Sequence, residues 1–176
     1  MPTYRKPGDA GSVIQFSFFA PKEPSWNANF LTLHFRASSA TLDIRTRGRG
    51  MHPFTHEVLE WLRRTGPGEG LLTLFIQHTS ASLLIQENAD PDVQTDLATA
   101  LRNLAPAQAP WVHSIEGPDD MPAHVKAMLT GVSLHVPVAA GKLSLGTWQA
   151  IYIAEHRSSP HSREVILQFI GNPRRP

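Results

Sequence analysis

The stretch from residue 71 to residue 79, Leu-Leu-Thr-Leu-Phe-Ile-Gln-His-Thr, constrains the fold more than any other part of the chain. Its apolar side chains fall on both faces of an extended chain, which is the pattern of a strand in the middle of a sheet. His78 continues the face of Leu72, Leu74 and Ile76 at the end of this strand. The chain is therefore expected to build a sheet around this segment.

Six other segments have the composition or the alternation of strands, and they are residues 31–36, 41–46, 82–86, 132–138, 148–156 and 164–170. Residues 37–40 suit a hairpin connection between the first two of these strands. The last two are expected to pair as a hairpin across residues 157–163. Strands thus follow one another in adjacent groups, which favours an α+β fold over a doubly wound parallel sheet.

Three helices are predicted. Pro53 suits the first turn of one, and Asp90 is a good N-cap for a second, whose expected buried stripe is Val93, Leu97, Ala100, Leu101 and Leu104. The third helix follows an acidic loop, and Gly131 can cap its end in the left-handed conformation. The predicted fold is one domain of mostly antiparallel, sandwich-like β-sheets with about three helices.

Residues 1–27 mix proline, glycine, serine and charge, and they are predicted to form a partly ordered N-terminal extension to a domain at residues 28–176. Phe18, Phe19 and Trp26 could pack onto the domain or onto a neighbouring subunit. A net charge of +1 and the lack of a basic stripe argue against nucleic-acid binding. No run approaches the ~18 apolar residues of a membrane span, and no signal peptide is visible, so a cytoplasmic location is expected.

The segment from His113 to His124 carries chemistry that packing does not require. Two imidazoles bracket Glu116, Asp119 and Asp120 on a loop rich in turn-forming residues. Because the chain has no cysteine, any metal site must use histidine and carboxylate ligands. The alternative interpretation is a solvated loop that caps the following helix.

Three histidines, His78, His113 and His124, lie at the ends of different predicted elements. If these ends meet, the imidazoles could supply an open three-histidine metal site. His156 is the substitute if His78 points into the core, because it also ends a strand. Asp119 or Glu155 is expected to orient an imidazole through its second nitrogen.

A second group of residues could bind anions. The glycine-rich residues 141–149 include Lys142, and their backbone amides could cradle an anion, although such a segment is more often an ordinary turn. Arg157 and Arg163 could hold phosphate, with solvated arginines as the alternative. Residues 77–82 lack the glycines of a nucleophile elbow, which argues against a serine hydrolase.

Several motifs together resemble the YjbQ family over residues 29–172. They are Gln77-His78-Thr79-Ser80-Ala81-Ser82-Leu83, Glu87-Asn88-Ala89-Asp90-Pro91, Asp96, His113, Glu116-Gly117-Pro118-Asp119-Asp120-Met121-Pro122-Ala123-His124, Gly141, Gly146-Thr147-Trp148-Gln149, Glu155-His156-Arg157 and Arg163. The resemblance implies a homotrimeric α+β protein whose sites are lined by these segments. It also implies a metal-assisted transferase with thiamine-phosphate synthase activity, which joins an aminopyrimidine diphosphate to a thiazole phosphate and releases pyrophosphate.

The expected site follows from the resemblance and the residue chemistry together. Catalytic residues are predicted at Glu155, Arg163 and Asp119, and metal ligands at His78, His113 and His124. Substrate-binding residues are predicted at Thr79, Ser80, Asn88, Lys142, Gly146, Thr147 and Arg157. The cofactor is expected to be a divalent metal, Zn²⁺ or Mg²⁺, and the partner a phosphorylated small molecule, with no nucleic acid and no membrane. The alternative functions are a phosphate-ester or anion-binding module without turnover and a metal-dependent hydrolase.

Overall fold

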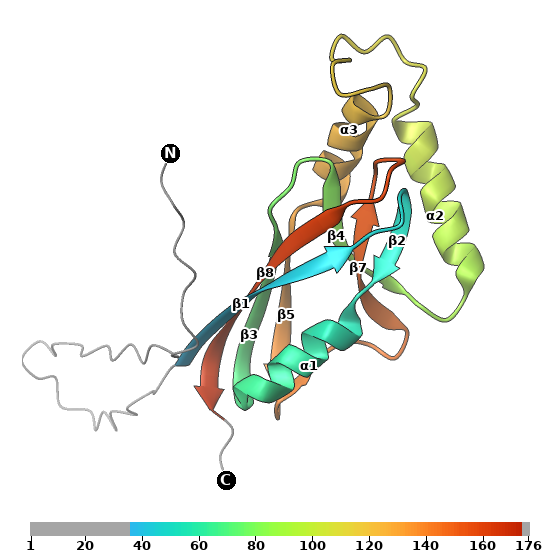
Figure 1. Cartoon of the computed structure of the whole chain (residues 1–176). Coiled ribbons are helices and arrows are strands. Elements are labelled where there is room, and N and C mark those ends of the chain that lie inside the picture. The colour runs from blue at the N-terminus through green and yellow to red at the C-terminus, as the bar shows by residue number, and fades with distance from the viewer. Residues whose placement is uncertain (1–35, 174–176) are drawn as a thin grey trace, which may run out of the picture.

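The computed structural model describes residues 36–173, which form two antiparallel sheets and three helices (Figure 1). The larger sheet has the order β1 (Arg36–Arg45), β8 (Ser162–Pro173), β3 (Pro67–Ile76), β5 (Ser133–Ala139) and β6 (Lys142–Leu143). The smaller sheet has the order β2 (Gly50–Pro53), β7 (Gln149–Glu155) and β4 (Ala81–Glu87). The helices are α1 (Thr55–Thr65), α2 (Pro91–Leu104) and α3 (Asp120–Thr130). The predicted α+β class with mostly antiparallel sheets is confirmed.

Strand β3 is central, as its apolar pattern predicts, because β8 and β5 pair with its two edges. Its inward side chains Leu72, Leu74 and Ile76 are fully buried. On the other face, Leu71 and Phe75 remain 43% and 42% exposed. The second apolar face of this strand therefore points away from the hydrophobic core of the chain.

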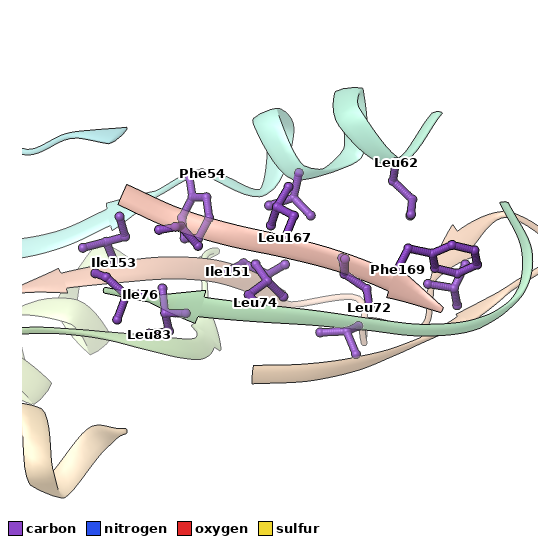
Figure 2. Close-up of a cluster of buried hydrophobic side chains, with 14 of the residues drawn as sticks. Phe54, Leu62, Leu72, Leu74, Ile76, Leu83, Ile151, Ile153, Leu167 and Phe169 are labelled. Atoms are coloured by element: carbon purple, nitrogen blue, oxygen red, sulfur yellow. The ribbon is translucent and has the colours of Figure 1, made fainter. Parts of the chain in front are cut away.

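The core lies between the two sheets and under α1 (Figure 2). Phe54, Val58 and Leu62 recur at the spacing of one helical face and pack against the sheets. Ile151 and Ile153 of β7 meet this cluster from the smaller sheet. These contacts fix the sheets relative to each other, and so they position the strand ends that carry polar side chains.

Helix α2 begins as predicted but packs less closely than predicted. The Asp90 side chain accepts a hydrogen bond from the Asp92 amide at 2.9 Å, and Pro91 occupies the first helical position. No residue of α2 is buried, however, and Leu104 is 65% exposed. The predicted buried stripe is wrong because α2 covers the small β2–β7 edge and not the main core.

Both predicted hairpins are wrong. Residues 37–40 do not turn, because β1 runs straight through them and pairs with β8 from Arg36↔Gly171 to Arg45↔Ser162. Strands β7 and β8 lie in different sheets, each between two other strands. Sequence alternation shows which face of a strand is apolar but does not identify its partner, and here the intervening loop crosses from one sheet to the other.

Two further differences concern glycine-containing segments. Pro53, which was expected in the first turn of a helix, instead lies at the end of the short strand β2, residues 50–53. Gly131 follows α3 with φ +94° and ψ 162°, so it has a positive φ but not the predicted left-handed helical conformation. The extension at residues 1–27 and the predicted strand residues 31–35 lie outside the described residues. None of the helices within residues 36–173 is long and apolar enough to cross a membrane.

Candidate metal centre

Asp120 and His124 lie one turn apart at the start of α3, where the i, i+4 spacing places both side chains on the same helix face. His124 Nε2 is 3.2 Å from Asp120 Oδ2. The loop before α3 brings His113 Nε2 to 2.7 Å from the same oxygen. The three donor atoms lie within 4.8 Å of one another, and they form a group that could hold a metal ion.

Metal bonds of about 2.0–2.2 Å would place neighbouring donor atoms roughly 3.0–3.5 Å apart. The separations from Asp120 Oδ2 are 2.7 Å, just below this range, and 3.2 Å, inside it, so small rotations of the side chains would suffice to admit an ion. The two imidazole rings are tilted at 56° with centroids 5.7 Å apart, and they do not stack face to face. Both rings present Nε2 to the shared carboxylate oxygen.

A hydrogen bond to the backbone shows which ring nitrogen of His124 carries a proton. Its Nδ1 lies 3.0 Å from the backbone carbonyl oxygen of Thr79, which can only accept a hydrogen bond, so Nδ1 carries a proton. In the neutral ring, Nε2 then has a lone pair that faces the carboxylate of Asp120. Two acceptors at 3.2 Å repel each other unless a cation lies between them, and that cation is either a metal or a second proton on the ring.

Asp120 is held ionised despite being 1% exposed. Burial alone would raise its pKa, but the hydrogen bond from His113 and the charge of Arg157 outweigh burial and lower the pKa. Arg157 Nη1 donates to Asp120 Oδ1, which leaves Oδ2 facing the two imidazoles. Arg157 thus orients the carboxylate through the oxygen that does not face the imidazoles, and metal-ligating carboxylates are usually hydrogen-bonded in this way.

Arg157 also fixes the loop in front of α3. Its Nη2 donates to the backbone oxygen of Glu116 at 2.6 Å, and its Nε lies 3.3 Å from Asp119 Oδ1. Asp119 accepts a hydrogen bond from the Ser158 amide at 2.7 Å, and its pKa is lowered because this bond and Arg157 outweigh burial. Asp119 and Arg157, which were predicted as catalytic and substrate-binding residues, therefore support the position of Asp120.

His78 lies outside the group of potential ligands. Its Nδ1 accepts hydrogen bonds from the amides of Thr79 and Ser80, both at 3.1 Å, so a neutral ring carries its proton on Nε2. Burial, followed by the charge of Arg163, lowers the pKa of His78 and favours that neutral form. These bonds hold the short loop whose Thr79 carbonyl orients His124, so His78 acts on the centre indirectly.

His156, the predicted substitute, is also not in the group. It is 3% exposed, and its Nε2 is 2.8 Å from the hydroxyl of Ser82, which in turn accepts from Thr130 at 2.6 Å. Burial, followed by the charge of Lys126, lowers its pKa to about 4. The ring is therefore a neutral component of the core between β4, α3 and the end of β7.

The depressed pKa of His156 predicts acid sensitivity. Between its ordinary pKa of 6.5 and the folded-state pKa of about 4, the unfolded chain binds more protons than the folded chain. The free energy of unfolding should therefore fall as the pH falls through this window, by about 2 kcal/mol between pH 7.5 and pH 5. Urea denaturation at a series of pH values measures this decline. In His156→Gln, which cannot titrate, most of the decline should vanish, and an unchanged decline would contradict the assignment.

The predicted catalytic residues Glu155 and Arg163 form a buried ion pair. Arg163 Nε and Nη2 donate to the two carboxylate oxygens at 2.7 and 2.8 Å, and both residues are 1% exposed. Glu155 also accepts from Thr46 Oγ1 and from the Arg157 amide, and these bonds with Arg163 lower its pKa against the effect of burial. Because the carboxylate oxygens of Glu155 and the guanidinium of Arg163 are already engaged in these hydrogen bonds, the geometry argues against a catalytic or phosphate-binding role for either residue.

The remaining predicted binding residues lie at the other end of the sheets. The register of β4 and β7 pairs Ala81 with Glu155 at one end and Glu87 with Gln149 at the other. Six residues of strand separate the two ends by roughly 20 Å. The far end of β4 is followed directly by Asn88, and the far end of β7 is preceded by Gly146 and Thr147. Lys142 lies at the β5–β6 turn. Only Thr79 and Ser80 of the predicted substrate-binding set join Arg157 near the centre.

Asp120 is the residue that sequence reasoning missed. The available signal was its spacing from His124, because an acidic residue four positions before a histidine at a helix start places both on one face. His113 could be connected to this pair only through the loop geometry that the structure provides.

Comparison with known proteins identifies the family of this chain. The model of the family described as UPF0047 protein YjbQ-like matches residues 40–172. A UPF0047 protein of Synechocystis is 48% identical over 78% of this chain and 94% of its own length. The UPF0047 protein YjbQ of Salmonella typhimurium is 42% identical over 74% of this chain and 96% of its own length. A crystal structure of a hypothetical protein from Aeropyrum pernix matches with a TM-score of 0.71 and 31% identity, over 77% of this chain and 99% of that one.

The same comparisons correct the function implied by the resemblance. The relatives are described as UPF0047 proteins, and a structural relative from Sulfolobus solfataricus is described as a YbjQ-like protein of unknown function. Neither description names thiamine-phosphate synthase activity, so that assignment is overturned, and neither names anion binding or hydrolysis. The matches do establish the family: the chain belongs to the UPF0047 family of YjbQ-like proteins.

Proposed function

We propose that this protein binds one divalent transition-metal ion through His113 Nε2, Asp120 Oδ2 and His124 Nε2. The observation that carries the proposal is that His113 Nε2 and His124 Nε2 lie 2.7 and 3.2 Å from the same oxygen of a buried carboxylate, while His124 Nδ1 faces the Thr79 carbonyl. An ion between them converts two mutually repelling acceptors into two ligands. The Thr79 carbonyl then orients the imidazole through its other nitrogen, as is usual for histidine ligands.

The donor set favours a transition metal over magnesium. Mg²⁺ prefers six oxygen ligands and keeps much of its water, whereas two imidazoles and one carboxylate suit Zn²⁺ or a related ion. Three protein ligands leave a position for an exchangeable oxygen ligand. His113 and Glu116, on the loop in front of α3, are both exposed, so solvent reaches this side of the centre.

The residues around the centre suit such a role. A bound ion would act as a Lewis acid on an oxygen ligand. Arg157 supports Asp120 from the side away from the imidazoles, and His78 keeps the loop at residues 78–80 in place. The chain therefore supplies both the ligands and the contacts that fix their orientation.

Titration calorimetry tests this proposal on protein that has never been exposed to a nickel column. Zinc should bind at one equivalent per chain, with release of protons if His124 is an imidazolium in the free protein. Magnesium should bind far more weakly. If neither zinc nor another transition metal binds, the three residues form an ion-paired cluster and the proposal fails.

We propose in addition that the protein assembles as a homotrimer. Leu71, Phe75 and Ile170 are 42–48% exposed on the outer face of the larger sheet, where Leu71 pairs directly with Ile170. Contiguous exposed apolar side chains of this kind mark association surfaces. Light scattering should return three times the chain mass at micromolar concentration. A monomer mass would contradict this prediction, and Phe75→Glu should weaken the assembly whereas Arg64→Glu, on α1, should not.

A further inference from the structure

Strand β1 is the open edge of the larger sheet (Figure 1). Within residues 36–173 it pairs with β8 along one side only, and the register runs without a bulge from Arg36↔Gly171 to Arg45↔Ser162. Every second residue of such an edge strand points its backbone N–H and C=O groups away from the sheet. Natural edge strands are commonly protected by a bulge, a proline, a lysine or a covering segment, and β1 has none of the first three. A covering segment is therefore expected along this edge.

The rim of the hydrophobic core is also open beside β1. Leu42 and Ile44 pack against the core, but both are only partly buried. A cleft of about 540 Å³ lies next to the same end of β1 and separates it from β2 and the start of α1. The consecutive residues Asp43, Ile44 and Arg45 all line this cleft, so it opens along the free edge of the strand and not on one face of the sheet. A strand added beside β1 would cover this rim.

Residues 13–19, Val-Ile-Gln-Phe-Ser-Phe-Phe, have a sequence that suits this position. Ile14, Phe16 and Phe18 alternate with Gln15 and Ser17, so an extended chain would present one apolar face. The segment contains no charged residue and no proline. An uncharged apolar segment of this kind promotes aggregation unless it is paired and covered. The segment and the edge of β1 thus have complementary requirements.

The length of chain between the segment and β1 permits this pairing. Residues 20–35 separate the two, and fully extended they would span up to roughly 50 Å. Strand β1 is itself only about 34 Å long. Pro21, Pro24 and Asn27 are turn-forming residues, so the chain can reverse its direction before it enters β1. Because a short tether gives a high effective concentration, the segment of the same chain has an advantage over a second copy.

We propose that residues 13–19 bind the free edge of β1 as an additional antiparallel strand. The side chains of Ile14, Phe16 and Phe18 would lie on the same face as Leu42 and Ile44, where aromatic and aliphatic neighbours on adjacent strands stabilise a sheet. The backbone groups of β1 that point away from β8 would gain hydrogen-bond partners. The added strand would also remove β1 as a template for edge-to-edge association between chains.

Hydrogen exchange of the full chain, followed by mass spectrometry of peptides from residues 36–45, tests this proposal. In the wild type, the amides of β1 that point away from β8 should exchange slowly. Phe16→Asp places a charge on the covered face and should accelerate their exchange roughly tenfold or more, because the added strand detaches. Ser17→Asp introduces the same charge on the opposite face and should leave the exchange unchanged.

Three results of this experiment would overturn the proposal. They are rapid exchange of all the outward amides of β1 in the wild type, equal exchange in the wild type and in Phe16→Asp, and equal acceleration by Phe16→Asp and Ser17→Asp. The last result would show an effect of charge alone. Neither the proposed metal nor its ligands take part, so this proposal and the metal proposal can fail separately.

A photo-crosslinking phenylalanine analogue at position 18 identifies the surface that the segment contacts and the chain that supplies it. In trimers or monomers prepared from a mixture of isotope-labelled and unlabelled chains, cross-links should reach residues 36–57 and join peptides with the same label. Cross-links between labelled and unlabelled peptides would assign the edge to a second copy. Cross-links only to the outer face around Leu71 and Phe75, or none to residues 36–57, would place the segment elsewhere. Each of these results would overturn the proposal.

Discussion

Replacing Arg163 with methionine is expected to lower the free energy of unfolding by about 3–5 kcal/mol. The substitution leaves the carboxylate of Glu155 buried, and among residues 36–173 the hydrogen-bond donors that remain to it are Thr46 Oγ1 and the Arg157 amide. Breaking one half of a buried, bidentate ion pair leaves an uncompensated charge, which costs far more than the pair contributes relative to an apolar substitute. Urea denaturation near neutral pH measures the difference.

Two controls give this prediction its specificity. Arg64→Met removes an exposed i, i+4 pair with Glu60 and should change the free energy of unfolding by no more than about 0.5 kcal/mol. The double variant Arg163→Met with Glu155→Gln should recover part of the loss, because neither position of the pair then carries a charge. A loss below about 1 kcal/mol in Arg163→Met would show that Glu155 and Arg163 are not the structural pair described.

The second large effect concerns the metal. His124→Ala is expected to reduce zinc affinity by at least about 100-fold, since removal of a direct ligand should exceed the 10–100-fold effect of removing the groups that orient ligands. His56→Ala alters an exposed histidine of α1 and serves as the matched control, with affinity unchanged. Calorimetric titration compares the two variants with the wild type.

The outcome at His124 separates the two explanations of the short contacts. If a metal joins the residues, affinity falls sharply and the stoichiometry of the tight site goes to zero. If His124 is an imidazolium paired with Asp120, zinc titration gives the same weak signal in the variant and in the wild type. Equal affinity in all three proteins would rule out His124 as a ligand.

Much of the fold follows from local chemistry. Asp90 and Pro91 specify the start of α2, and the apolar residues at 71–76 specify a central strand. The pairing of the strands could not be predicted in the same way. Strands β7 and β8 are neighbours in sequence, but they lie in different sheets, and each pairs with two other strands. Pairing depends on which apolar faces pack together, and that is a property of the whole chain.

The candidate site shows the same limit. His113 and His124 meet as predicted, because the loop and the start of α3 are fixed by Arg157. His78 could not be excluded from sequence, since its role depends on hydrogen bonds between its ring and the two amides that follow it. Burial likewise could not be foreseen for Arg163, because charged residues are rarely buried unless paired.

Diffraction from zinc-equilibrated crystals, recorded above and below the zinc absorption edge, tests the metal centre most directly. One anomalous peak per chain is expected, at bonding distance from His113 Nε2, Asp120 Oδ2 and His124 Nε2, with Thr79 still accepting from His124 Nδ1. No peak at these atoms, or a peak only at other histidines such as His56 or His135, would contradict the account.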